Sequence, residues 1–126
     1  MPVKYTVTEK GNPLSPTEPK KWYANAKSAG DTTLRALGKE IAARSTVAPA
    51  DTNAVLIALT EVLVEHLADG KIVRLGDFGA FQVSVGSAGA ETKEKFNTSM
   101  IKTKKIAFRP GVDLKEMLNN LKFEKA

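Results

Sequence analysis

The sequence contains no cysteine, so it can form neither a disulfide framework nor a thiolate metal site. Long apolar runs are also missing. The longest, Ala54 to Leu59, is followed by Thr60 and Glu61, whereas about 20 apolar residues are needed to span a bilayer. The first residues lack the apolar run of a secretion signal. Together these absences indicate a cytoplasmic protein.

Residues that commonly perform catalysis or bind metals are scarce as well. The single histidine, His66, lies beside Leu63 and Leu67, and without a second histidine or a cysteine we expect no metal site. Glu61 and Glu65 are one helical turn apart and fit a solvated helix face better than a catalytic pair. We therefore expect no catalytic residues and no cofactor, which argues against an enzyme.

The basic charge of the chain is concentrated in its second half. The length of 126 residues suits one compact core, and 42% hydrophobic with 26% charged residues is normal for a folded protein. Residues 1–70 carry eight basic and eight acidic side chains, whereas residues 71–126 carry eleven and six, which accounts for the net charge of +5. A local excess of this kind is typical of polyanion binding. The alternative is a solvated face that only maintains solubility.

Two helices joined by a short turn are the clearest local prediction. The first starts after Thr32 or Thr33 and ends near Arg44. Pro49 suits the first turn of the second helix, and Gly70 is well placed just beyond its end. The second helix carries a broad apolar stripe made of Val55, Leu56, Leu59, Val62, Leu63 and Leu67.

On either side of these helices the hydrophobic period changes to two, which predicts strands. In the N-terminal part, residues 3–7 and 20–26 are expected strands, separated by a loop with three prolines. After Gly70, residues 72–75, 78–83 and 101–108 are expected strands, and Pro110-Gly111 ends the last one. Asp113 can start a final amphipathic helix.

Two motifs in the second half resemble the HU and integration host factor family of bacterial DNA-bending proteins. They are Gly70-Lys71-x-Val73-x-Leu75-x-x-Phe78-Gly79-x-Phe81 and, after a gap of hairpin size, Phe108-Arg109-Pro110-Gly111-x-x-Leu114-Lys115. The resemblance covers about Thr32 to Leu121. The extra N-terminal segment is similar to that of longer HU-related proteins from Bacteroidetes-type bacteria.

The resemblance implies an α+β fold in which a helix pair precedes a three-stranded antiparallel sheet with an extended basic β-arm and a C-terminal helix. Residues 1–30 would form a strand-containing extension, residues 31–126 the DNA-binding domain, and residues 83–109 the arm. It also implies an intertwined homodimer, and a twofold partner would cover the apolar stripe of the second helix. Alternatively, residues 1–30 fold back over that stripe within a monomer.

The expected partner is duplex DNA, held by flexible cations that suit phosphate contacts. The candidate contacts are Lys71, Arg74, Lys93, Lys95, Lys102, Lys104, Lys105 and Arg109. Arg109 matches the basic position of the family's Phe-basic-Pro-Gly element. Strand alternation puts Lys102 and Lys104 on one face and Lys105 on the other, which ranks Lys105 lower unless a bulge intervenes.

The tip of the arm departs from the family pattern. Better-known members carry an Arg-Asn-Pro tip whose proline wedges between base pairs, but here no proline occurs between Pro49 and Pro110. Phe96 or Met100 could replace that wedge, or could simply pack within the hairpin. Near the N-terminus, Trp22 and Tyr23 could stack on bases or could anchor the extension to the core.

The sequence therefore predicts a histone-like protein of the nucleoid that binds duplex DNA mainly without sequence preference, through its minor groove and phosphate backbone. No membrane or small-molecule substrate is expected. The alternative is a protein-interaction or structural module that kept the scaffold while its arm lost DNA bending.

Overall fold

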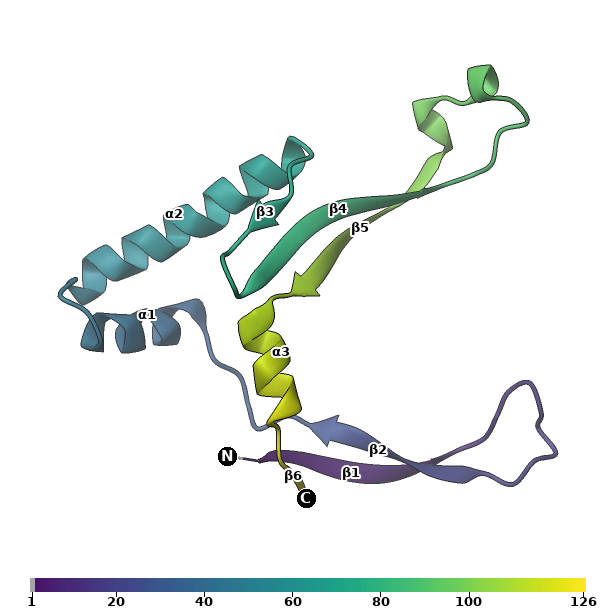
Figure 1. The fold of residues 1–126 in the computed structure, drawn as a ribbon, viewed down its shortest axis with the longest axis horizontal. Helices are drawn as coiled ribbons and strands as arrows, with labels where there is room; N and C mark the ends of the chain where they lie inside the picture. The colour runs from purple at the N-terminus through teal and green to yellow at the C-terminus, as the bar shows by residue number, and fades with distance from the viewer. Residues whose placement is uncertain (1) are drawn as a thin grey trace. The chain divides into compact units, whose positions relative to one another are not determined.

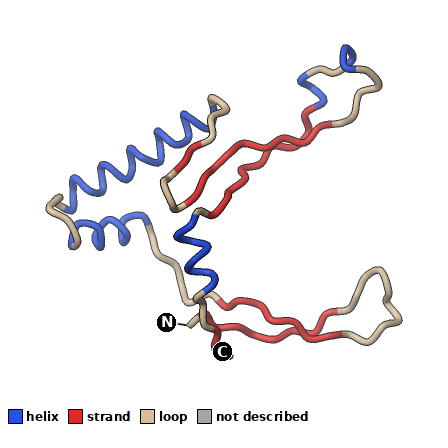
Figure 2. The backbone as a smooth tube through the Cα atoms, in the orientation of Figure 1, coloured by secondary structure: helices blue, strands red, loops and turns tan. Residues whose placement is uncertain are grey.

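The computed structural model describes residues 2–126 and has the mixed α+β composition that the sequence predicts (Figures 1 and 2). In chain order its elements are β1 (Val3–Lys10), β2 (Lys21–Lys27), α1 (Leu34–Ala43), α2 (Pro49–Ala68), β3 (Val73–Arg74), β4 (Gly79–Ser87), the 3-10 helices η1 (Lys93–Lys95) and η2 (Thr98–Met100), β5 (Ile101–Pro110), α3 (Val112–Asn119) and β6 (Phe123–Lys125).

The described chain forms two compact units. One contains residues 2–33 together with Met117–Ala126, and the other is Leu34–Glu116. The expected extension, residues 1–30, falls within the first unit, which also includes the last ten residues of the chain. Each unit has its own three-stranded sheet, with strand orders β2-β1-β6 and β3-β4-β5.

The sheet of the first unit is an antiparallel ribbon with a short third strand. β1 and β2 pair from Lys4 opposite Lys27 to Lys10 opposite Lys21. β6 lies parallel to β1 and pairs only with its first three residues. The Val3 amide donates a hydrogen bond of 2.8 Å to the Lys122 carbonyl, so the C-terminus is tied to the start of β1. The sequence pattern contained no signal for β6.

The helix pair of the second unit starts and ends where the sequence predicts. Pro49 occupies the first turn of α2, where its missing amide costs nothing. At the other end Gly70 adopts a φ of 79°, and its amide bonds to the Leu67 carbonyl while that of Lys71 bonds to the His66 carbonyl. This is the Schellman arrangement, which satisfies the last carbonyls of a helix and directs the chain into β3.

The helices α1 and α2 approach closely where their side chains are small. Gly38 of α1 is buried, and a Cβ atom built on it would lie 3.4 Å from Leu56 Cδ1. Thr52 of α2 is 4% exposed, and its hydroxyl donates a 3.0 Å hydrogen bond to the Ala48 carbonyl. The contact between the two helices therefore depends on small residues.

The second sheet is organised around a cluster of phenylalanines and one glycine. The ring of Phe108 lies 4.7 Å from that of Phe81 and 5.9 Å from that of Phe78, between ring centroids. A Cβ atom on Gly79 would lie 2.6 Å from the Arg109 carbonyl oxygen and 2.7 Å from the Phe108 ring. Gly79 therefore permits the close packing that its place between two phenylalanines predicts.

Within one chain this fold has no buried apolar core. Among residues 2–126 no hydrophobic side chain is buried, and Phe78 and Phe108 are 45% and 38% exposed. Exposure is large on α2 as well, where Val55 is 63% and Val64 is 67% exposed.

We predict that Gly79→Ala destabilises the fold by about 1–3 kcal/mol, the usual cost of forcing extra volume into a closely packed position. The measurement is the urea midpoint at one fixed protein concentration. Gly89→Ala is the matched control, since a Cβ atom at Gly89 meets nothing within 4 Å. Equal midpoints for the two variants would contradict the packing role of Gly79.

Candidate nucleic-acid interface

The register of the second sheet puts its phenylalanines on one face and its two arginines on the other. Val73, Phe81 and Phe108 lie opposite one another across the three strands, and the pair Val83 and Ile106 continues the same face. The residues between these positions point to the other face of the sheet. They are Arg74, Ala80, Gln82, Ser84, Lys105, Ala107 and Arg109. No acidic residue occurs in β3, β4 or β5. We call this second surface the sheet basic face.

Two arginines meet on the sheet basic face. Arg74 of β3 and Arg109 of β5 both lie opposite Ala80 of the central strand β4. They line two hollows together, one with Gln82 and Ala107 and the other with Gly79 and Gly111. Because Ala80 is small, both guanidinium groups remain exposed above it, where they can bind an anionic group.

The lysines of β5 fall on different faces. Lys105 lies opposite Ser84 and therefore shares the sheet basic face with Arg109. Lys104 lies opposite Val85, on the face that continues from the phenylalanine cluster. The register shifts between Gly86 and Ser87, and Lys102 stands in the irregular stretch of β5 that results. The bulge leaves Lys104 and Lys105 on opposite faces.

The connection between β4 and β5 is an ordered excursion rather than a tight turn. Two 3-10 helices follow one another, and Asn97 caps the second by accepting a 3.1 Å hydrogen bond from the Ser99 amide. Lys95 forms an exposed 3.1 Å ion pair with Glu91. The Lys102 ammonium donates to the Ser99 carbonyl at 3.1 Å. These two lysines therefore also stabilise the excursion.

The remaining candidates lie outside the strands of the second sheet. Lys71 follows the Schellman glycine, and Lys93 begins η1. Phe96 directly follows η1 and is 42% exposed, whereas Met100 ends η2 and is only partly exposed. Of the two possible wedges, Phe96 offers more apolar surface to a partner.

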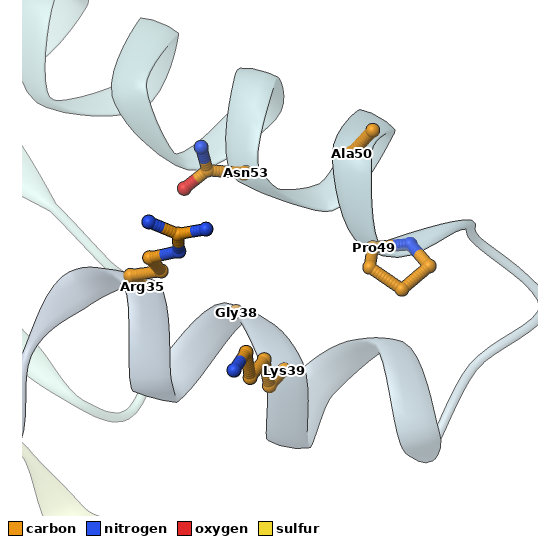
Figure 3. A pocket seen from close by; sticks show the side chains of 6 residues that line it. All are labelled: Arg35, Gly38, Lys39, Pro49, Ala50 and Asn53. Carbon is orange, nitrogen blue, oxygen red and sulfur yellow. The ribbon is translucent and has the colours of Figure 1, made fainter.

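A separate hollow lies between α1 and α2 (Figure 3). Its lining includes Arg35 and Lys39 of α1 and the residues Pro49, Ala50 and Asn53 of α2, and the Arg35 side chain points toward Asn53. These side chains include no nucleophile paired with a base. Within residues 2–126 there is also no group of three or more potential metal ligands, and no helix has the length and apolarity to cross a membrane.

The comparisons with known proteins agree with this HU-like fold. A putative DNA-binding protein from Bacteroides vulgatus aligns over 98% of this chain with a TM-score of 0.67 and 10% identity, but the match spans only 47% of that protein. The HU protein of Anabaena, solved in complex with DNA, aligns over 71% of this chain and 99% of its own, with a TM-score of 0.56 and 22% identity. No curated protein matches the sequence.

The fold and the comparisons thus define an HU-like protein. The family described as an HU domain fused to a wHTH, Ig or glycine-rich motif matches residues 1–125, and the chain belongs to this family. The resemblance to the HU family that the two sequence motifs indicate is therefore confirmed.

Proposed function

We propose that this protein binds duplex DNA as a homodimer, mainly through phosphates and the minor groove and without sequence preference, as an architectural component of the bacterial nucleoid. The observation that carries the proposal is the sheet basic face. It unites Arg74, Lys105 and Arg109 with small and polar residues and excludes acidic ones.

The charges of the β4–β5 ribbon favour phosphate contacts over base reading. Six basic residues lie between Lys93 and Arg109, five of which are lysines. An ammonium group acts as a point charge that accepts many phosphate geometries, whereas base recognition uses bidentate Arg, Asn or Gln. Such binding is expected in the range of about 10⁻⁶–10⁻⁴ M at physiological salt.

The two faces of the ribbon suggest a ranking among the candidate contacts. Arg74, Lys105 and Arg109 would form the main contact because they share one face. Lys71, Lys93, Lys95 and Lys102 would add contacts at the base and the tip of the ribbon, which is the proposed β-arm. Lys104 ranks lower, since it lies on the face that bears Val85 and Phe108. Phe96 is the better candidate for a wedge between base pairs.

The absence of a buried core supports the homodimer. A helix that is apolar around most of its circumference belongs in an interior, yet α2 exposes Val55, Ile57, Leu59, Val62 and Val64. Leaving these side chains in water forfeits the main driving force for folding. A second copy that packs on α2 would supply the missing core, as in obligate dimers whose single chains do not fold alone.

A second candidate function is a protein-interaction module on the same scaffold. It is favoured by the tip of the β4–β5 ribbon, which contains two 3-10 helices and no proline. The chain also spans about half the length of the Bacteroides vulgatus protein that it matches. A measurement of duplex binding by this chain distinguishes the two candidate functions, because only the first requires it.

We predict that Lys105→Gln weakens binding to a duplex and lowers the slope of log K against log salt by about one unit, as expected when one lysine–phosphate interaction is removed. Lys104→Gln is the matched control, because it removes the same charge one residue away on the opposite face. Fluorescence anisotropy with a labelled duplex between roughly 50 and 200 mM salt measures both. A larger effect of Lys104→Gln would refute the proposed face, and binding independent of salt would refute the phosphate mechanism.

We predict that Val64→Asp abolishes the dimer, since a buried carboxylate without a partner strongly opposes assembly. Sedimentation velocity measures the change. In a monomer the same substitution would alter stability by no more than about 0.5 kcal/mol, because Val64 is 67% exposed there. Ala58→Asp is the control, on the helix side that already carries Glu61 and Glu65. A Val64→Asp protein that sediments like the wild type would exclude this interface.

A further inference from the structure

The N-terminal ribbon sorts its charges by face. In the β1–β2 register Lys4 lies opposite Lys27, and Lys10 lies opposite Lys21. Lys10 is six positions after Lys4, an even number, so alternation puts all four lysines on the same face. The acidic residues of this region lie elsewhere, since Glu9 is on the opposite face and Glu18 is in the loop.

The surroundings of the four lysines are polar and almost free of acids. Between the two lysine pairs lie Thr6, Thr8, Tyr23 and Asn25, and the Asn25 amide donates a 2.7 Å hydrogen bond to the Thr8 hydroxyl. The exception is Glu124 of β6, which lies beside Lys4. We call the surface formed by Lys4, Lys10, Lys21 and Lys27 the hairpin basic face. The other face of this sheet, which we call the apolar face, has Tyr5, Ala24, Ala26 and Phe123 around a hollow, and it also carries Glu9 and Lys125.

Like charges directly opposite each other destabilise a strand pair. All four lysines are exposed, and within residues 2–126 no hydrogen bond or ion pair engages their side chains. β6 reaches only as far as Tyr5, so beyond it the ribbon is two-stranded, and an isolated two-stranded ribbon is marginally stable in water. A polyanion bound to this face would remove the repulsion and stabilise the ribbon.

We propose that the hairpin basic face is a second DNA-contacting surface, in which the two lysine pairs bind phosphates of a duplex. The inference rests on duplex DNA being the ligand of the protein. The Lys4–Lys27 pair and the Lys10–Lys21 pair are about 20 Å apart along the ribbon, because a strand rises about 3.3 Å per residue. A duplex presents about one phosphate per 1.7 Å of its axis, so lysine pairs at this spacing meet phosphates without a fixed sequence or register.

The first test measures duplex binding by variants that lose lysine charges from one or the other face of the N-terminal sheet. Lys10→Gln/Lys21→Gln removes the pair that has no acidic neighbour on its own face, and we expect the salt slope of duplex binding to fall by about 0.9 for each phosphate that is no longer neutralised. Glu9→Gln/Lys10→Gln leaves the net charge unchanged, and we expect it to weaken binding too. Lys125→Gln lowers the net charge on the apolar face, next to Tyr5, and we expect wild-type binding. Lys10→Arg/Lys21→Arg should bind like the wild type.

The second test locates the DNA-binding lysines in the unaltered protein. Lysine acylation followed by mass spectrometry, with and without a saturating duplex, should show slower modification of Lys10 and Lys21 in the complex. Lys125 should react equally in both states. Equal rates at Lys10 and Lys21 with and without DNA would overturn the inference.

Parallel titration of Lys105→Gln/Arg109→Gln separates this inference from the proposed function. If that variant weakens binding while Lys10→Gln/Lys21→Gln binds like the wild type, the hairpin basic face is refuted and the sheet basic face stands. If only the hairpin variant weakens binding, the sheet basic face is refuted and the inference stands. If the wild-type protein binds no duplex at low salt, both are refuted.

Discussion

The constraint on which the functional surfaces depend is the alternation of side chains along a strand. In each ribbon the register decides which cations share a face, and a slip of one residue would transfer every side chain to the other face. Such a slip in β5 would exchange Arg109 with Phe108, which would separate the arginine from Arg74 and the phenylalanine from Phe81. Gly79 opposes this because only a glycine there accepts the Arg109 carbonyl at close range. Its role in packing is thus also a role in positioning charge.

A second physical constraint is the missing interior. A chain of 126 residues normally buries enough apolar surface to offset the conformational entropy of folding, but in this single chain the described residues bury no apolar side chain. Part of this exposed apolar surface lies on α2 and around Phe78 and Phe108, in the same unit as the β4–β5 ribbon. In the proposed homodimer, folding, assembly and presentation of the basic ribbon are therefore coupled, and removal of the second copy eliminates the basic surface along with the stability.

Local signals were enough to predict much of this fold. Pro49 and Gly70 predicted the ends of α2, and the spacing of Phe78, Gly79 and Phe81 predicted the base of the second sheet. β6 could not be predicted, since three residues near Phe123 pair with a strand at the other end of the chain. The hairpin basic face was hidden for a different reason: charge counts over residues 1–70 cancel. The structure extends β1 to Lys10, so alternation puts Glu9 and Lys10 on opposite faces, and the register puts Lys21 on the face of Lys10. This placement separates charges that a count combines.

The composition of the basic faces bears on what kind of DNA binding they can support. Lysines gain affinity mainly through release of counterions, which increases with the number of phosphates neutralised and carries no sequence information. A proline tip, by contrast, deforms the duplex at one base step. This chain lacks that tip but has lysines on two separate ribbons. If both ribbons contact DNA, affinity and salt dependence increase together while specificity does not, as suits a protein that coats DNA rather than one that marks a site.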